Sequence, residues 1–330
     1  MFTNPLTTRE SPDPFVVLHD GYYYAIECTP GLGESLKIAK SKRLADIFNV
    51  EPTTVYTSTH EYFQYSHWAP ELWYLNGEWY IYTCAINGEN IFNDTRRVIV
   101  LKGTSQNPQD PFEFAAELEL GDYYGLDATV LNAPNGKLYL LWSGGKTIGQ
   151  GYPTQVYIAE MESPTKMKIP GERVLLRETT LPWEYQLADN GDLGEGKECH
   201  VTEGPICLVR NNVVSMVYSC NGFGNENYCL GMMVCRNATD SDFRNWKWEV
   251  SPEPVFAKTD KVWGPGHNSF TVSPDGTETW NIYHSKRERD EDAFRWANMQ
   301  KVEWENDVPI LGVPVDPGVE LEEPSGTESN

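Results

Sequence analysis

The chain has 330 residues, and its 48 acidic side chains against 26 basic ones give a formal net charge of −22 at neutral pH. A surface of this sign repels phosphate backbones, so we expect no nucleic-acid partner. No apolar run reaches the length of a membrane-spanning helix, and we expect no membrane partner either. The acidity fits a neutral substrate, and it equally fits a general aid to solubility.

Turn-forming and aromatic residues are frequent along the chain, with 27 Gly, 22 Pro and 12% aromatic residues. This composition is typical of many short strands joined by tight turns. The first such unit is FVVL-HDG-YYYAI, which begins at Phe15 and carries an Asp-Gly turn between two strand-like runs. Asp-Gly in this setting predicts a β-hairpin.

The same hairpin recurs four more times along the chain. Its apolar first strand, its turn with Asn-Gly, Asp-Gly or Asn-Asn, and its aromatic second strand begin at Phe15, Leu72, Thr129, Cys207 and Phe270. The intervals of 57, 57, 78 and 63 residues each leave room for about four short strands. We therefore predict an all-β fold, a five-bladed β-propeller with four-stranded antiparallel blades around a central funnel. An irregular β-sandwich is the alternative.

One domain accounts for the whole series of hairpins. We predict a single propeller over residues 1–318, followed by an acidic tail over 319–330, VELEEPSGTESN, that is expected to be disordered.

A polar residue lies at or just before the start of each repeated hairpin. The five are Asp13, Glu71, Asp127, Glu203 and His267. Each has an ordinary structural interpretation on its own, such as an Asp-Pro turn or a histidine satisfied in the core. Inner strands of a propeller begin near the central axis, however, so we expect these positions to converge. Converging carboxyl groups raise one another's pKa, which lets an acid and a base coexist at one pH.

The motifs SPDPF, HWAPEL, LDATV, EGP and GPGHNSF in this order, with DAFRWANMQKVEW near the end, resemble glycoside hydrolase family 43 over about residues 10–315. The resemblance implies a five-bladed propeller that degrades arabinan or xylan. The segments DPFVVLHDGYYY, WAPELWYLNGEWYIY and GPGHNSFTVSPDGTE are similar to the branch of exo-α-1,5-L-arabinofuranosidases.

The resemblance also assigns catalytic roles by motif. It implies that Asp13 is the general base, that Glu203 is the general acid, and that Asp127 orients the acid and tunes its pKa. Glu71 is expected to brace its turn. Inverting hydrolysis needs a protonated carboxyl group beside the leaving oxygen and a carboxylate holding water on the opposite face, about 6.5–9.5 Å apart.

Other residues are expected around the carboxyl groups. The resemblance implies that Arg295 contacts them, that Trp68 lies near the sugar, and that His267 holds a calcium or other ion through water. From their aromatic character, Tyr152 and Tyr228 are predicted to stack on the sugar with Trp68. Each of the three aromatic side chains also has an interpretation as a core residue. The segment 182–200, PWEYQLADNGDLGEGKECH, is longer than the family pattern and is expected to form an extra wall on the funnel.

We therefore predict an inverting exo-α-L-arabinofuranosidase that removes terminal arabinofuranosyl residues from α-1,5-arabinan or arabino-oligosaccharides of the plant cell wall. A β-xylosidase or arabinoxylan arabinofuranohydrolase in the same fold is one alternative, and a non-catalytic sugar-binding propeller is another. We expect a monomer that needs no cofactor for its chemistry. The first residues show no signal-peptide pattern, which favours the cytoplasm, with export after signal removal as the alternative.

Overall fold

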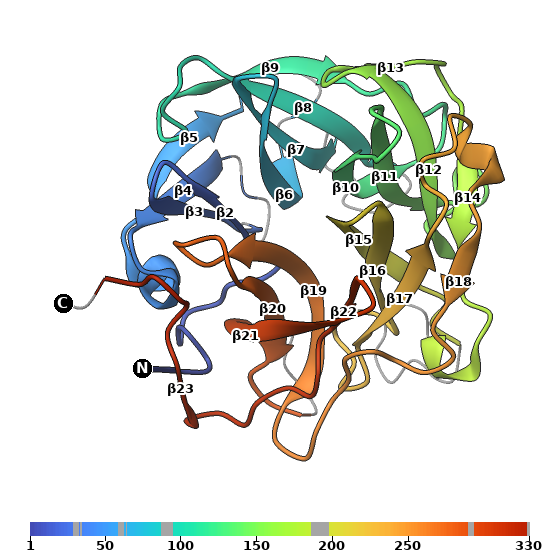
Figure 1. The fold of residues 1–330 in the computed structure, drawn as a ribbon. Coiled ribbons are helices and arrows are strands. Elements are labelled where there is room, and N and C mark those ends of the chain that lie inside the picture. The colour runs from blue at the N-terminus through green and yellow to red at the C-terminus, as the bar shows by residue number, and fades with distance from the viewer. Residues whose placement is uncertain are drawn as a thin grey trace.

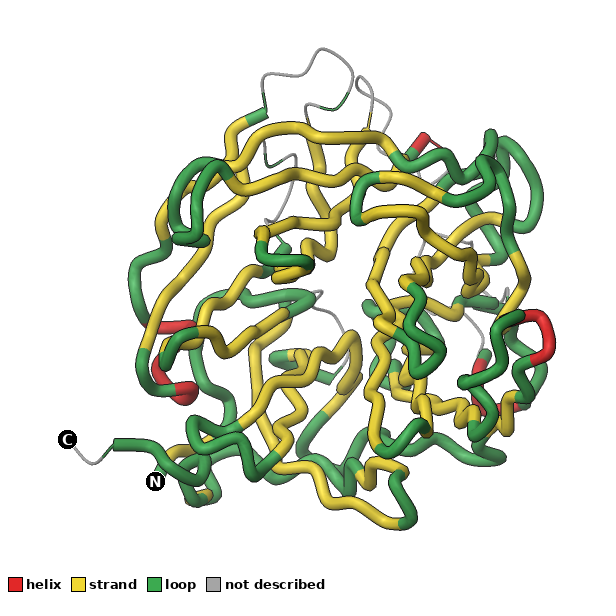
Figure 2. The backbone as a smooth tube through the Cα atoms, turned by 45° about the horizontal axis from the view of Figure 1, so that its top comes forward, coloured by secondary structure: helices red, strands yellow, loops and turns green. Residues whose placement is uncertain are grey.

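Five β-sheets surround a common centre in the computed structural model, which describes residues 1–28, 33, 35–58, 63, 65–86, 95–185, 198–289 and 294–328 (Figure 1). Figure 2 shows that strands and loops make up nearly all of the chain, with helix limited to short turns. In the described part, no helix is long and apolar enough to cross a membrane. The predicted five-bladed propeller is confirmed, and the sandwich alternative is wrong.

Each blade is built from consecutive strands, so the chain completes one blade before it begins the next. Blades one and two comprise β2 (Phe15–His19), β3 (Tyr22–Ile26), β4 (Ser35–Ser41), β5 (Thr53–Thr57), β6 (Tyr65–Leu75), β7 (Glu78–Ile86), β8 (Arg97–Gly103) and β9 (Phe112–Glu117). Blades three, four and five comprise β10 (Gly125–Asn132), β11 (Leu138–Gly145), β12 (Thr154–Ser163), β13 (Lys166–Met167), β14 (Val174–Arg177), β15 (Thr202–Arg210), β16 (Val213–Cys220), β17 (Cys229–Cys235), β18 (Trp248–Val250), β19 (Trp263–Val272), β20 (Thr279–Lys286), β21 (Arg295–Glu305) and β22 (Val308–Ile310).

Blade three departs from the expected four strands. Its outer edge is shared by two short strands, β13 and β14, which both pair with β12. The longer interval before the fourth hairpin therefore supplies an additional edge strand.

The five predicted hairpins form the two innermost strands of the five blades. Their turns have the backbone conformation that the sequence indicates. Both central residues have positive φ at Asp20-Gly21 (47° and 75°) and at Asn76-Gly77 (53° and 85°). Turns of this kind match the right-handed twist of the strands, and Asp, Asn and Gly tolerate the conformation best.

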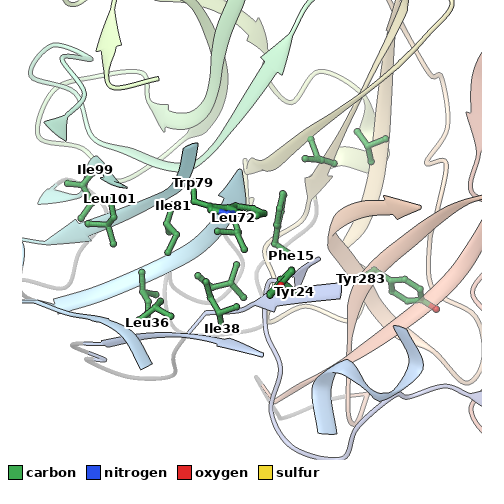
Figure 3. Close-up of a cluster of buried hydrophobic side chains, with 14 of the residues drawn as sticks. Phe15, Tyr24, Leu36, Ile38, Leu72, Trp79, Ile81, Ile99, Leu101 and Tyr283 are labelled. Carbon is green, nitrogen blue, oxygen red and sulfur yellow. The ribbon is translucent and has the colours of Figure 1, made fainter. Parts of the chain in front are cut away.

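Apolar surfaces hold neighbouring blades together. Figure 3 shows Leu36 and Ile38 of blade one near Ile81, Ile99 and Leu101 of blade two. All five side chains are completely buried in one core cluster. Because alternate residues of a strand face opposite sides of its sheet, every blade presents one such surface to each neighbour.

The N-terminal segment joins blade five to blade one. The Leu6 N–H donates to the Ala297 carbonyl at 2.8 Å, and the Ser11 N–H donates to the Arg295 carbonyl at 2.8 Å. These bonds run along β21, just before the chain enters β2. Backbone hydrogen bonds from the N-terminal segment to β21 therefore join blade five to blade one. The two ends of the chain do not share a blade.

The C-terminal tail is ordered where the structure describes it. β23 (Glu320–Leu321) pairs antiparallel with β1 (Phe2–Thr3). Glu323 accepts from Arg43 at 2.6 Å, and Ser325 donates its backbone N–H to Glu278 at 2.9 Å. The expected disorder is wrong for residues 319–328, because the tail pairs its backbone and its charges with the propeller.

The interface between blades yields a test of stability. Ile81→Ala removes a completely buried side chain from the cluster of Figure 3 and should lower the free energy of unfolding by about 2–5 kcal/mol. Ile148→Ala is the matched control, because Ile148 is 54% exposed and its truncation should change stability by less than about 0.5 kcal/mol. Urea unfolding curves compare the two variants. Equal midpoints would contradict a packed interface at Ile81.

Candidate active site

In every blade a residue in or just before the inner strand has positive φ at the same position relative to the hairpin. We call these five residues the axial ring. They are Asp13 (52°), Ala69 (41°), Asp127 (50°), Gly204 (54°) and His267 (44°). Each lies five residues before a cross-strand pair, and these pairs are Leu18↔Tyr23, Tyr74↔Trp79, Asn132↔Leu138, Val209↔Val214 and Val272↔Thr279. In blades two to five, the register of the hairpin shifts at this point.

The axial ring corrects the predicted set of equivalent positions. Ala69 and Gly204 occupy the ring, and the expected Glu71 and Glu203 do not. Glu203 immediately precedes its ring residue, whereas Glu71 follows its ring residue by two positions. Apart from glycine, Asp, Asn and His are the residue types most often found with positive φ. Such backbone strain is concentrated at functional sites in proteins.

A second set of five residues supports the axial ring. This supporting ring lies five residues after the same cross-strand pairs, and its members are Cys28, Cys84, Ser143, Ser219 and His284. His284 Nδ1 accepts the Asp13 N–H at 3.2 Å, and Ser219 Oγ accepts the His267 N–H at 2.9 Å. In both cases the second strand of one blade's hairpin accepts a hydrogen bond from the axial-ring residue of the next blade.

Asp13 lies among nitrogen-bearing side chains. Arg295 Nη1 donates to its Oδ1 at 3.0 Å, and the Nδ1 atoms of His267 and His284 each lie 3.3 Å from the same oxygen. Burial opposes ionisation, but His267 and the Arg295 guanidinium hold the pKa of Asp13 well below its usual range. The expected contact of Arg295 with the carboxyl groups is present, and Asp13 is ionised at neutral pH.

Asp127 is tied to the residue next to Glu203. Its Oδ2 accepts the Gly204 N–H at 3.0 Å and the Ser143 hydroxyl at 3.4 Å. Burial, followed by the nearby charges of Glu203 and Asp13, raises the pKa of Asp127 well above its ordinary value. The Gly204 bond fixes the peptide that carries Glu203, so Asp127 orients the glutamate through the backbone.

Glu203 has the opposite environment from Asp13. Burial raises the pKa of Glu203 to about 7, a hydrogen bond from Tyr228 opposes that rise, and the charge of Asp13 adds to it. Near neutral pH the two carboxyl groups therefore differ in protonation, because Asp13 is ionised whereas a substantial fraction of Glu203 is protonated. Such a pair can act as base and acid in one reaction.

Tyr228 does not have the predicted role of a sugar platform. The side chain is completely buried, and its hydroxyl donates to Glu203 Oε1 at 2.7 Å. Its ring stacks on His284 with 5.6 Å between centroids and 6° between planes. Since no face of the ring is open to a substrate, Tyr228 positions the glutamate instead.

The other expected sugar contacts differ in exposure. Trp68 is half-buried and directly precedes Ala69, as Glu203 directly precedes Gly204 in blade four. The guanidinium carbon of Arg96 lies 3.0 Å from the centroid of the Trp68 ring. Tyr152 is 39% exposed and lies two residues before β12, and its contact with a sugar stays a prediction. Sequence analysis did not single out Phe223, which is 39% exposed and whose ring centroid lies 4.5 Å from the Arg295 guanidinium carbon. The glycines on either side of Phe223 were the available signal.

Glu71 supports the structure of its own strand. The Trp73 indole N–H donates to Glu71 Oε2 at 2.7 Å, and burial raises the pKa of Glu71 to about 8. A largely neutral carboxyl group bonded two residues along its own strand agrees with the expected bracing role.

The residues around His267 do not fit direct coordination of calcium. Calcium takes six to eight oxygen ligands. His267 offers nitrogen and faces one carboxylate, Asp13, which is already bonded to Arg295. Among the described residues, no three His, Cys, Asp or Glu side chains form a group that could hold a metal ion. An ion held through water near His267 stays a prediction, and no catalytic step is derived through it.

The segment expected to form an extra wall is described at its two ends. Its first residues form a short helical turn, Pro182–Glu184, in which the Trp183 indole N–H donates to the Pro252 carbonyl at 2.8 Å. Tyr185 stacks on His200 at 4.6 Å, which brings the two ends of the segment together. Residues 186–197 lie outside the described part, so the wall stays a prediction.

The family model of glycosyl hydrolases family 43 matches residues 2–309. The chain belongs to this family. An α-L-arabinofuranosidase from Lactobacillus brevis has the same fold, with a TM-score of 0.82 and 30% identity over 97% of this chain and 98% of the other. An extracellular exo-α-(1→5)-L-arabinofuranosidase of Streptomyces avermitilis is 30% identical over 96% of this chain, and α-L-arabinofuranosidase 43 of Humicola insolens is 31% identical over 96%.

The family 43 chain spans 64% of the length of the Streptomyces avermitilis and Humicola insolens relatives. The Streptomyces avermitilis enzyme is named extracellular, as is a relative from Streptomyces chartreusis that is 28% identical. These names give the cytoplasmic expectation no support.

The glycine of the axial ring yields a second test of stability. A Cβ atom added at Gly204 would lie 3.2 Å from the His267 ring, in a backbone with φ of 54°. At Gly136, where φ is 79°, an added Cβ meets nothing within 4 Å. Gly136→Ala should therefore cost about 1 kcal/mol of backbone strain, and Gly204→Ala should cost more and displace His267. Thermal unfolding of both variants measures the difference, and an equal loss would contradict the close approach of Gly204 and His267.

Proposed function

We propose that this family 43 chain is an inverting, exo-acting α-L-arabinofuranosidase that removes terminal arabinofuranosyl residues from α-1,5-linked arabinan or arabino-oligosaccharides. The observation that carries the proposal is the contrast between two carboxyl groups. Asp13 is bonded to Arg295, whereas Glu203 is bonded to a neutral tyrosine and adjoins the residue held by Asp127. One carboxylate and one carboxylic acid at the same pH are what single-displacement glycoside hydrolysis requires.

The reaction follows from these two states. Glu203 gives its proton to the glycosidic oxygen as the bond to the anomeric carbon breaks. Asp13 takes a proton from a water molecule that attacks the same carbon from the opposite face. The products are free arabinose, with its anomeric centre inverted, and the shortened chain with a new hydroxyl group. Water is consumed, and the proton that reaches Asp13 returns to Glu203 through solvent.

The relatives and the surface chemistry support the choice of substrate and setting. Three relatives at 28–31% identity are named as arabinofuranosidases, two of them with α-(1→5) linkage. The half-buried Trp68 and the exposed Phe223 provide apolar faces for a furanose ring. We further propose that the protein is exported and acts as a monomer on a neutral glycan. The chemistry as derived uses no cofactor.

The stereochemistry of the product tests the mechanism. Proton NMR of the first-formed arabinose, recorded before mutarotation, should show the β anomer from an α-arabinofuranoside. Arabino-oligosaccharides should release arabinose alone from the earliest time points, because the action is exo. Initial α anomer would contradict water activation by Asp13. Turnover of the matching xyloside, with no turnover of the arabinoside, would favour the β-xylosidase alternative.

The pH dependence of activity tests the two carboxyl groups. Glu203 acts in its protonated form, so kcat/KM should fall as pH rises through about 7. Asp13 acts in its ionised form and its pKa is held low, so activity should persist well into the acidic range. Glu203→Gln should lose more than about 100-fold on unactivated oligosaccharides and much less on aryl arabinofuranosides with good leaving groups. An unchanged basic limb in this variant would assign the acid to another residue.

A further inference from the structure

We propose that Ser219 and Tyr228 form a hydrogen-bond relay that confines the catalytic proton of Glu203 to its Oε2 atom. Neither residue is expected to touch the substrate. Tyr228 is completely buried, and Ser219 lies behind it in the supporting ring. The relay rests on the proposed function, because it assigns a positioning role toward the general acid of that reaction.

The direction of the relay follows from its first member. The backbone N–H of His267 donates to Ser219 Oγ at 2.9 Å. A backbone N–H only donates, so the serine oxygen accepts there and its own hydrogen is free for another partner. We infer that this partner is the Tyr228 hydroxyl oxygen, because the Ser219 hydroxyl is among the groups that lower the pKa of Tyr228.

The last bond of the relay selects one oxygen of the glutamate. Because Tyr228 accepts from Ser219, its own hydrogen points to Glu203 Oε1, at 2.7 Å. An oxygen that accepts this bond is poorly placed to carry the acidic hydrogen as well. The protonated form of Glu203 therefore holds its hydrogen on Oε2. The glutamate is only partly buried while Tyr228 is fully buried, so Oε2 is the oxygen nearer the open side.

Packing on the Tyr228 ring keeps the relay in place. His284 stacks on the ring, with 6° between the two planes. Gly266 approaches the ring so closely that an added Cβ would lie 2.4 Å from it. His284 and Gly266 therefore restrict the Tyr228 ring to one rotamer, in which its hydroxyl group bonds Glu203.

The relay also affects the acidity of Glu203. Burial and the charge of Asp13 favour the protonated form, whereas the Tyr228 hydrogen bond and Arg295 favour the ionised form. Asp127 faces the same peptide through Gly204. Removal of the tyrosine hydroxyl takes away a donor to the carboxylate, so the pKa of Glu203 should rise.

Tyr228→Phe tests the relay with a change of one oxygen atom. We expect kcat on arabino-oligosaccharides to fall about tenfold with little change in KM, because the proton is no longer confined to one oxygen. Aryl arabinofuranosides with good leaving groups should lose less. The basic limb of the pH profile should move upward by on the order of one pH unit. Ser219→Ala, which leaves the ring in place, should move the limb in the same direction by a smaller amount.

Tyr218→Phe is the matched control. Tyr218 is also completely buried in the same blade, and its hydroxyl donates to a glutamate, Glu184, at 2.7 Å. Glu184 is paired with Arg177, and neither residue belongs to the axial ring. This variant should lose stability and keep the wild-type pH profile and the wild-type ratio of rates on the two substrate classes.

The outcomes separate the relay from the proposed function. Equal losses on both substrate classes with an unmoved basic limb in Tyr228→Phe would overturn the relay and leave a packing role. If that variant does not fold, an unmoved limb in Ser219→Ala overturns it. A wild type inactive on every arabinofuranoside would overturn the proposed function instead. In that case ¹³C NMR titration of the Glu203 carboxyl group, assigned by difference from Glu203→Gln, still tests the relay. The relay requires a higher pKa of Glu203 in Tyr228→Phe than in the wild type.

Discussion

The left-handed backbone at the start of each inner strand is the constraint on which the site depends. A regular strand directs alternate side chains to opposite faces of its sheet. One residue with positive φ breaks that alternation, and in blades two to five the hairpin register shifts there. The conformation costs roughly 1–2 kcal/mol at each residue other than glycine, and four of the five axial-ring residues are not glycine. Hydrogen bonds from the supporting ring, each worth about 0.5–1.5 kcal/mol net, offset part of that cost.

The same backbone conformation gives carboxyl groups of different pKa in different blades, because the side chains that contact them differ. Arg295 of blade five donates to the Asp13 carboxylate and stabilises its charge, and His284 of the same blade accepts the Asp13 backbone N–H. In blade four the residue with positive φ is Gly204, so the carboxyl group belongs to the preceding residue, Glu203, and it accepts a hydrogen bond from Tyr228 rather than from an arginine. Because both carboxyl groups are shielded from water, solvent screens the effects of these neighbouring groups only weakly. Two carboxyl groups on one pseudo-symmetric scaffold therefore hold protons with very different strength.

Sequence reasoning recovered the features that depend on local pattern. Recurring hairpins gave the number of blades, and motif order identified Asp13, Asp127 and Glu203, which the structure brings near one another. The prediction that Glu71 and Glu203 are equivalent to the other axial-ring residues was wrong. Membership of the ring depends on the backbone φ angle, and the spacing of residues in the sequence does not show φ. Tyr228 was misread because an aromatic residue in a loop looks the same whether it is buried or exposed. The tail was misread because its order depends on pairing with β1, at the other end of the chain.

His284 completes the electrostatic account of the acid. Its Nδ1 accepts the Asp13 N–H, so this nitrogen bears no hydrogen, and burial lowers the pKa of the imidazole to about 4. The ring is therefore neutral near neutral pH. A neutral ring can lie flat against Tyr228 without bringing a positive charge toward Glu203. A protonated ring in the same place would favour the ionised form of Glu203. The burial that keeps His284 neutral thus allows one aromatic stack to hold the Asp13 backbone N–H on one side and the Glu203 carboxyl group on the other.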